Sequence, residues 1–110
     1  MKFIPLESTE QLNEIKKAEG YNVIFKHNTA CAISKGVRRK METEADKMAG
    51  VEAVYFLDLP ANRNLSDAIA LDFDVQHESP QLLLIKNGRC VYDEWGSDIS
   101  ADATAAAVEK

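Results

Sequence analysis

Cys31 is the side chain whose surroundings in this sequence most clearly favour chemistry. Just before it lies an apolar run, residues 23–25, which is long enough for one buried strand. Apolar residues follow it at helical spacing, namely Val37, Met41, Ala45 and Met48. Backbone N–H groups and the helix dipole favour an anion where a helix begins, and cysteines so placed have pKa values of roughly 3.5–7.5. The sequence therefore predicts a reactive thiolate at Cys31; the alternative, which position alone leaves open, is an inert buried cysteine.

Ser34 occupies the position that a second cysteine takes in a Cys-x-x-Cys pair. Its hydroxyl can donate a hydrogen bond to the Cys31 thiolate, but it cannot close a disulfide. We also expect the N–H groups of Ile33 and Ser34 to stabilise the thiolate, since the first N–H groups of a helix lack intrahelical partners. A mixed disulfide on Cys31 must then wait for a thiol from solution, which is monothiol chemistry. The alternative is that Ser34 is only a first-turn helix residue.

The elements that position Cys31 can be followed along the chain by their apolar spacing. Strands are predicted at residues 2–6, 22–26, 51–59, 81–86 and 90–92. Helices are predicted at residues 9–18, 31–49 and 101–108, and a short further helix is predicted to begin at Asn64 or Ser66. Asn87-Gly88 predicts a hairpin between the last two strands. The early alternation requires parallel strands, and the hairpin adds antiparallel ones. We expect an α/β fold with a central mixed five-stranded sheet and helices on both faces, in one domain over residues 1–110.

Composition excludes several classes of protein. The chain is 45% apolar and 28% charged, as in an ordinary globular protein, and its net charge of −5 speaks against nucleic acid as a partner and against a membrane-surface patch. No apolar run is long enough to span a bilayer, and residues 1–5 lack the features of a signal peptide, so we expect a cytoplasmic protein. Two cysteines and two histidines at scattered positions give no zinc-site spacing, so no metal site is expected.

Two blocks of the sequence carry a resemblance to a known family. Residues 26–34 read Lys-His-Asn-Thr-Ala-Cys-Ala-Ile-Ser. This block resembles the active-site motif of the monothiol bacilliredoxin (YtxJ-like) family, which runs Lys-His-x-Thr-x-Cys-x-Ile-Ser. The second block, residues 63–81, ends in His-Glu-Ser-Pro-Gln and is followed by Asn87-Gly88. The sequence departs from the family at Ala32, where proline is common, and at residues 93–95, which read Asp-Glu-Trp where members often carry Ser-His-Trp.

The resemblance implies a thioredoxin-like fold and a thiol–disulfide oxidoreductase that lifts a small thiol such as bacillithiol off protein cysteines. Cys31 would be the nucleophile. The residues supporting it would be Thr29, Ala32, Ile33, Ser34 and His27. The substrate-binding residues would be Ser79, Pro80, His77 and Lys26. His27 could act on a nearby proton and Lys26 could attract the carboxylates of bacillithiol, although strand alternation leaves open that one of them simply points to solvent.

The same resemblance also bears on the cofactor, the co-substrate and the partners. No tightly bound cofactor is expected, and bacillithiol or a similar low-molecular-weight thiol would be the co-substrate. The partners would be S-thiolated proteins, and the protein itself is expected to be a monomer. Two other functions stay open: a redox-silent thioredoxin-fold binding module, and a redox sensor whose Cys31 is capped by a small thiol. A Cys31 pKa near 8.5 would favour the binding module.

The resemblance also implies where Pro80 and Cys90 lie relative to Cys31. The Ser79–Pro80 peptide bond would be cis and would lie beside Cys31, with the Ser79 backbone turned towards a substrate segment. The strand that follows would carry the chain about 20 Å away before the hairpin turns it back. Cys90 would then lie far beyond the Cα separation of roughly 4.4–6.8 Å that a disulfide needs. We therefore expect no pairing of Cys90 with Cys31.

Overall fold

The computed structural model describes residues 2–108 and arranges five strands in one sheet, in the order β1-β3-β2-β4-β5. The strands are β1 (Lys2–Pro5), β2 (Tyr21–His27), β3 (Val51–Asp58), β4 (Gln81–Lys86) and β5 (Arg89–Trp95). β1 and β2 each run parallel to β3, whereas β4 runs antiparallel to both β2 and β5. The predicted mixed five-stranded sheet is confirmed.

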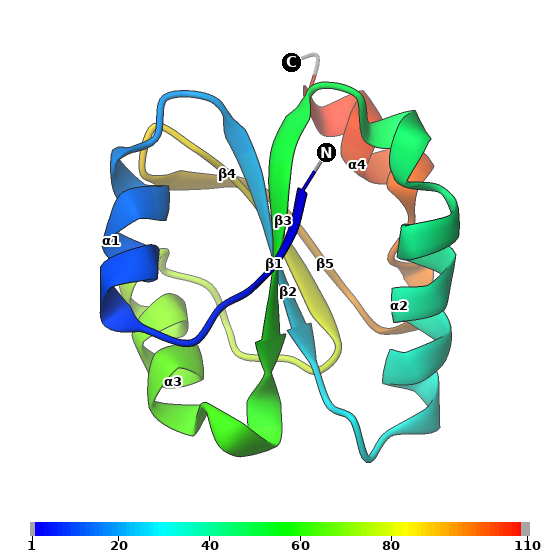
Figure 1. Cartoon of the computed structure of the whole chain (residues 1–110), viewed down its shortest axis with the longest axis horizontal. Coiled ribbons are helices and arrows are strands. Elements are labelled where there is room, and N and C mark those ends of the chain that lie inside the picture. The colour runs from blue at the N-terminus through cyan, green and yellow to red at the C-terminus, as the bar shows by residue number, and fades with distance from the viewer. Residues whose placement is uncertain (1, 109–110) are drawn as a thin grey trace.

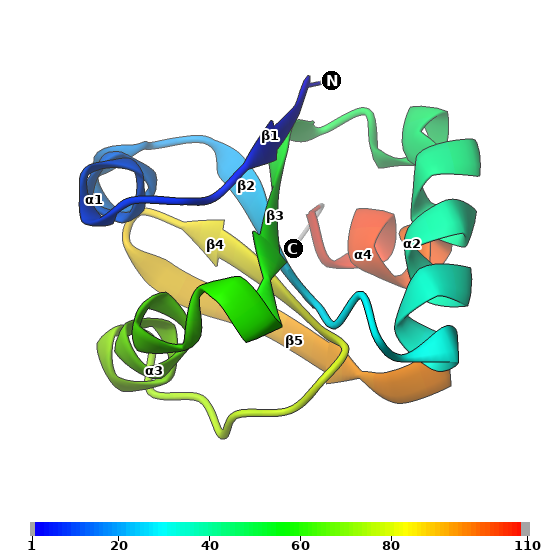
Figure 2. The same ribbon diagram turned by 60° about the horizontal axis from the view of Figure 1, so that its bottom comes forward.

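Helices cover both faces of this sheet (Figure 1). They are α1 (Thr9–Lys17), α2 (Ala32–Thr43), α3 (Arg63–Asp72) and α4 (Ala101–Val108), joined by the 3₁₀ turns η1 (Ala45–Met48), η2 (Leu59–Ala61) and η3 (Gly96–Asp98). α1 and α3 pack on one face, and α2 and α4 pack on the other (Figures 1 and 2). The sheet is therefore the middle layer of three.

The central strand β2 divides its side chains between two hydrophobic cores. Val23 and Phe25 belong to the core beneath α2 and α4, whereas Ile24 belongs to the core beneath α1 and α3. The division follows because successive side chains of a strand point to opposite faces. The same alternation sends Lys26 towards α3 and His27 towards α2, and this decides their surroundings below.

The helix predicted over residues 31–49 is wrong after residue 43. α2 ends at Thr43, Glu44 leaves the helical conformation with φ −105° and ψ 19°, and η1 follows as a separate 3₁₀ turn. Met41 and Met48 are nevertheless both fully buried in the same core. Apolar spacing is satisfied equally by one long helix and by a helix followed by a tighter turn, so periodicity could not distinguish them.

α1 begins with a hydrogen-bonded cap that offers a direct test of local stability. The Ser8 hydroxyl accepts from the Gln11 N–H at 3.3 Å, and the Gln11 side chain accepts from the Ser8 N–H at 3.2 Å. We expect Ser8→Ala to lower the free energy of unfolding by about 1 kcal/mol in urea denaturation. Thr9→Ala, at the exposed neighbouring position, is the matched control and should change it by less than about 0.5 kcal/mol. Equal losses would show that the cap is not the cause.

Candidate active site around Cys31

A short hydrogen-bonded turn carries the chain from β2 to α2. The Asn28 side-chain oxygen accepts from the Ala30 N–H at 2.9 Å, and the Asn28 carbonyl accepts from the Cys31 N–H at 3.0 Å. Thr29 Oγ1 donates to Asp58 Oδ1 at 3.5 Å, which connects the turn to the end of β3. Asn28 was not among the predicted site residues. An asparagine at the end of a strand is a turn signal that could have found it.

Cys31 is the N-cap residue of α2, and its side chain is partly exposed. The N–H of Ser34, and after it the N–H of Ile33, lower the pKa of the Cys31 thiol; burial acts in the opposite direction. These are the two N–H groups expected from the sequence, and they lack intrahelical partners because they lie in the first turn. The arrangement favours a thiolate that is both stabilised and accessible.

Ser34 lies in the first turn of α2, three residues after Cys31, and is fully buried. Its hydroxyl gives the smallest contribution that lowers the pKa of Cys31. Within the described residues, Ser34 Oγ has no hydrogen-bond partner. An unpaired buried hydroxyl costs about 1–3 kcal/mol, so the thiolate is a favourable acceptor for it.

Residues 76–80 enter the sheet at the end where β2 stops (Figure 2). Gln81, the first residue of β4, lies opposite Lys26 near the end of β2. The Ser79–Pro80 peptide bond is cis, Pro80 is buried, and Ser79 is exposed. The Pro80 carbonyl accepts from the Gly96 N–H at 3.0 Å. Ser79, Pro80 and the loop to Cys31 therefore share one end of the sheet.

His27 is buried under α2, with 3% of its surface exposed. Burial lowers the pKa of His27, and the nearby Arg38 guanidinium lowers it further, although Asp58 partly offsets this. Its Nδ1 has no hydrogen-bond partner among residues 2–108. His27 is not among the groups that shift the pKa of Cys31. It borders a small hollow of about 220 Å³ whose other lining residues are Phe3, Pro5, Arg38, Glu42, Phe56 and Asp58.

Lys26 does not lie where a surface site for carboxylates would need it. Lys26 has no exposed surface, and its Nζ lies 3.1 Å from His77 Nδ1 and 3.4 Å from the Ser66 carbonyl oxygen. Burial lowers the pKa of Lys26 to about 8, against the opposing influence of Asp67. Both Lys26 and His27 are buried, so the alternative that one of them points to solvent is wrong. His77, which contacts the Lys26 ammonium, is itself an exposed residue.

Cys90 lies at the far end of the sheet from Cys31. It pairs with Ile85 of β4, which pairs with Asn22 at the start of β2, whereas Cys31 follows the end of β2. Both thiols are free. Burial, with the Asp93 carboxylate adding to it, raises the pKa of Cys90 to about 11. The predicted separation of the two cysteines agrees with this register.

A family comparison fits this geometry. A model of the family described as monothiol bacilliredoxin BrxC matches residues 4–104, which include the turn, the first helical turn of α2 and residues 76–80. The chain belongs to the monothiol bacilliredoxin family. As a bacilliredoxin, it is a thiol–disulfide oxidoreductase with a thioredoxin-like fold.

Solved structures similar to this bacilliredoxin support the same fold. One is described as having a thioredoxin fold; it has a TM-score of 0.83 and 29% sequence identity, over 98% of this chain and 94% of that chain. Thioredoxin from Malassezia sympodialis has a TM-score of 0.77 and 18% identity, over 99% and 90% of the two chains. Thioredoxin from Trypanosoma brucei brucei has a TM-score of 0.79 and 16% identity, over 98% and 88%.

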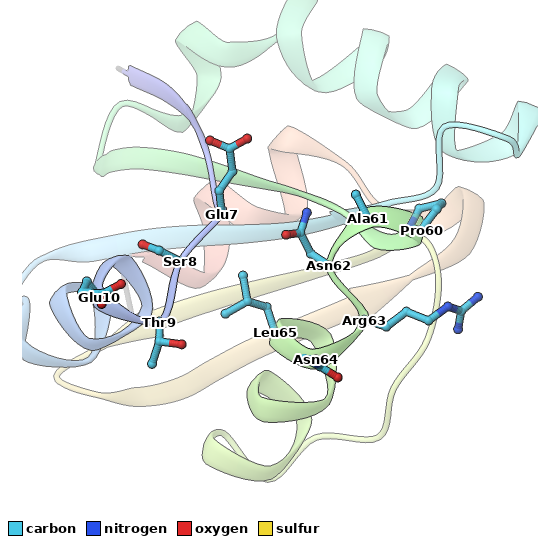
Figure 3. Close-up of a pocket in the computed structure, with 10 residues that line it drawn as sticks. All are labelled: Glu7, Ser8, Thr9, Glu10, Pro60, Ala61, Asn62, Arg63, Asn64 and Leu65. Atoms are coloured by element: carbon cyan, nitrogen blue, oxygen red, sulfur yellow. The ribbon is translucent and has the colours of Figure 1, made fainter.

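A hollow of about 530 Å³ lies between the first residues of α1 and α3 (Figure 3), and Cys31 does not line it. Residues 7–10 line one side and residues 60–65 line the other. Its lining includes two carboxylates, Glu7 and Glu10, and the guanidinium of Arg63, so it favours neither an anionic nor a cationic ligand. No predicted site residue lines it, and we assign it no role in the chemistry of Cys31.

Two further features bear on partners and cofactors of the bacilliredoxin. Among residues 2–108, no group of three or more His, Cys, Asp or Glu side chains could hold a metal ion. None of the helices in this part of the chain has both the length and the apolar character needed to cross a membrane.

Proposed function

We propose that this bacilliredoxin removes a low-molecular-weight thiol, bacillithiol or a close relative, from mixed disulfides on proteins. The Cys31 thiolate attacks the sulfur of the small thiol, the disulfide bond breaks, and the protein cysteine leaves as a thiolate that takes up a proton. Cys31 then carries the small thiol. A second small-thiol thiolate attacks that sulfur, which frees Cys31 and produces the disulfide of the small thiol. Each step exchanges one disulfide for another, and the second small-thiol molecule is the reductant, since it ends as half of the small-thiol disulfide.

The observation that carries this proposal is the accessible thiol with a lowered pKa at the start of α2. A lowered pKa increases the thiolate fraction of Cys31 near neutral pH and makes it a better leaving group when it is released. Ser34 cannot form a disulfide, and Cys90 lies at the other end of the sheet. The small thiol on Cys31 therefore has no internal route of release, which supports the monothiol mechanism.

The protein substrate would lie across the end of the sheet where Cys31 is found. The exposed Ser79 can present its backbone to an extended segment, next to the buried Pro80. Apolar side chains are exposed at the same end: Ile33 is 57% exposed, and Trp95, opposite Gln81 on β5, is 56% exposed. Thr29 holds the loop to β3, and Ala32 begins α2. We assign these residues to substrate contact and loop support.

Intact mass spectrometry after incubation with oxidised bacillithiol, and separately with oxidised glutathione, tests the proposed function. We expect one adduct, located on Cys31, that the matching free thiol reverses. The thiol that gives the faster and fully reversible adduct is the preferred co-substrate. Cys31→Ser is the control and should form no adduct at this position. Absence of an adduct with both disulfides, in folded protein with an alkylatable Cys31, would contradict the proposal.

A further inference from the structure

Lys26 is a buried cation without a carboxylate partner. Its side chain has no exposed surface, and among residues 2–108 no carboxylate forms an ion pair with it. Asp67 acts on it only through space. Burying an ammonium without an ion-pair partner costs free energy. The contacts that Lys26 makes therefore indicate its role in the fold. Those contacts are His77 Nδ1 at 3.1 Å and the Ser66 carbonyl at 3.4 Å.

His77 connects this buried ammonium to the segment that carries Ser79 and Pro80. The residue as a whole is exposed, but its Nδ1 faces inward, where Ser66 Oγ lies 3.2 Å away in addition to Lys26 Nζ. Ser66 belongs to α3 and Lys26 to β2, so the ring joins two elements of the scaffold. The position of the His77 ring therefore depends on groups far from it in the sequence.

Gln81 holds the backbone of the same segment beside Lys26. The two residues are paired across β2 and β4 and lie on the same face of the sheet. Gln81 Nε2 donates to the Gln76 carbonyl at 3.0 Å, and Gln81 Oε1 accepts from the Glu78 N–H at 3.3 Å. Gln81 thus holds the backbone on both sides of His77, while Lys26 holds the His77 ring.

We propose that Lys26 is a positioning residue for exchange, which acts through His77 to fix residues 76–80 where a protein disulfide meets Cys31. This role rests on the proposed function of Cys31. Lys26 touches no reacting atom, since its side chain has no exposed surface. Its effect on the reaction is the placement of Ser79 and Pro80.

The contact requires a neutral His77, because Nδ1 must accept the hydrogen bond from the ammonium. Burial and then Lys26 lower the pKa of His77, with a smaller contribution from Arg63, whereas Asp67 and Glu78 raise it; the net direction is below 6.5. Near neutral pH the ring is therefore an acceptor. Protonation would place two cations 3.1 Å apart and would release the ring.

The titration of His77, followed by NMR in the whole protein, tests the contact itself. In Lys26→Met we expect the pKa of His77 to rise by about one unit, because a neighbouring positive charge is removed. His27 is the internal reference, since burial and Arg38 set its pKa and Lys26 does not contribute. Lys17→Met, at an exposed lysine of α1, is the matched control and should leave both histidines unchanged. An unchanged His77 pKa in Lys26→Met would overturn the proposal.

The rate of small-thiol removal from an S-thiolated protein tests the role in exchange. Lys26→Met and His77→Ala should each slow it about tenfold, because displaced substrate contacts cost rate even when the nucleophile is intact. The double variant should be no slower than either single one, and His77→Asn, which keeps an acceptor near Nδ1, should retain most of the rate. The pKa of Cys31, measured by alkylation against pH, should stay unchanged in all of them.

Three outcomes would overturn the positioning role. They are wild-type rates in both Lys26→Met and His77→Ala, additive losses of rate in the double variant, and a changed pKa of Cys31 in any of the variants. Should Lys26→Met fail to fold, His77→Ala carries the test, since His77 is exposed. Failure of the proposed function gives a different result from failure of the positioning role. If the proposed function is wrong, wild-type protein forms no adduct on Cys31, whereas the His77 titration still shows whether the Lys26 contact exists.

Discussion

Replacing Cys31 by serine will reduce the removal of the small thiol to the rate seen without protein. Only a thiolate attacks a disulfide sulfur at a useful rate, and a serine hydroxyl stays protonated near neutral pH. In the variant, the N–H groups of Ile33 and Ser34 have no anion to stabilise. The measurement is the time course of small-thiol release from an S-thiolated protein, followed by intact mass.

Cys90→Ser is the matched control for this loss and should leave the rate essentially unchanged. The pKa of Cys90 is about 11, so its thiol is protonated near neutral pH, and its register places it at the other end of the sheet. The wild-type rate should follow the thiolate fraction of Cys31, rising with pH and levelling off at a lower pH than for an unperturbed cysteine. Equal losses in the two serine variants would contradict a single-cysteine mechanism.

Lys26→Met will increase the free energy of unfolding near pH 7. A pKa that falls from 10.5 to about 8 corresponds to about 3 kcal/mol by which the folded state disfavours the ammonium. Methionine fills a similar volume without a charge. The hydrogen bonds to Ser66 and His77 are lost, at about 0.5–1.5 kcal/mol each, so we expect a net gain of about 1 kcal/mol in urea denaturation.

This gain should shrink as the pH rises. Below about pH 8 Lys26 is protonated in both the folded and the unfolded states, so its contribution to stability is constant. Between about pH 8 and 10.5 the unfolded state binds more protons, so the wild type gains stability relative to Lys26→Met. Unfolding at pH 7 and pH 9.5 measures this change. Lys17→Met should show no such pH-dependent difference. A variant less stable than wild type at pH 7, with no change at pH 9.5, would contradict the argument.

Much of the fold could be predicted because its signals are local. The apolar run of β4 and the Asn87-Gly88 turn lie within a few residues of one another, and the structure has the hairpin there, with both turn residues at positive φ. α4 has the predicted bounds for the same reason. The end of α2 could not be predicted, because Met41 and Met48 reach the same core through either a long helix or a helix and a turn.

The sequence by itself determined which backbone N–H groups surround Cys31. A thiol at the start of a helix interacts with N–H groups two and three residues further on, so the strand-then-helix pattern was sufficient to predict them. The surroundings of Lys26 were decided only by the tertiary structure. Its partners Ser66 and His77 lie 40 and 51 residues away, and they reach Nζ only because the sheet order places β4 beside β2 and α3 over that face. Contacts between distant residues depend on register and packing, which apolar spacing does not specify.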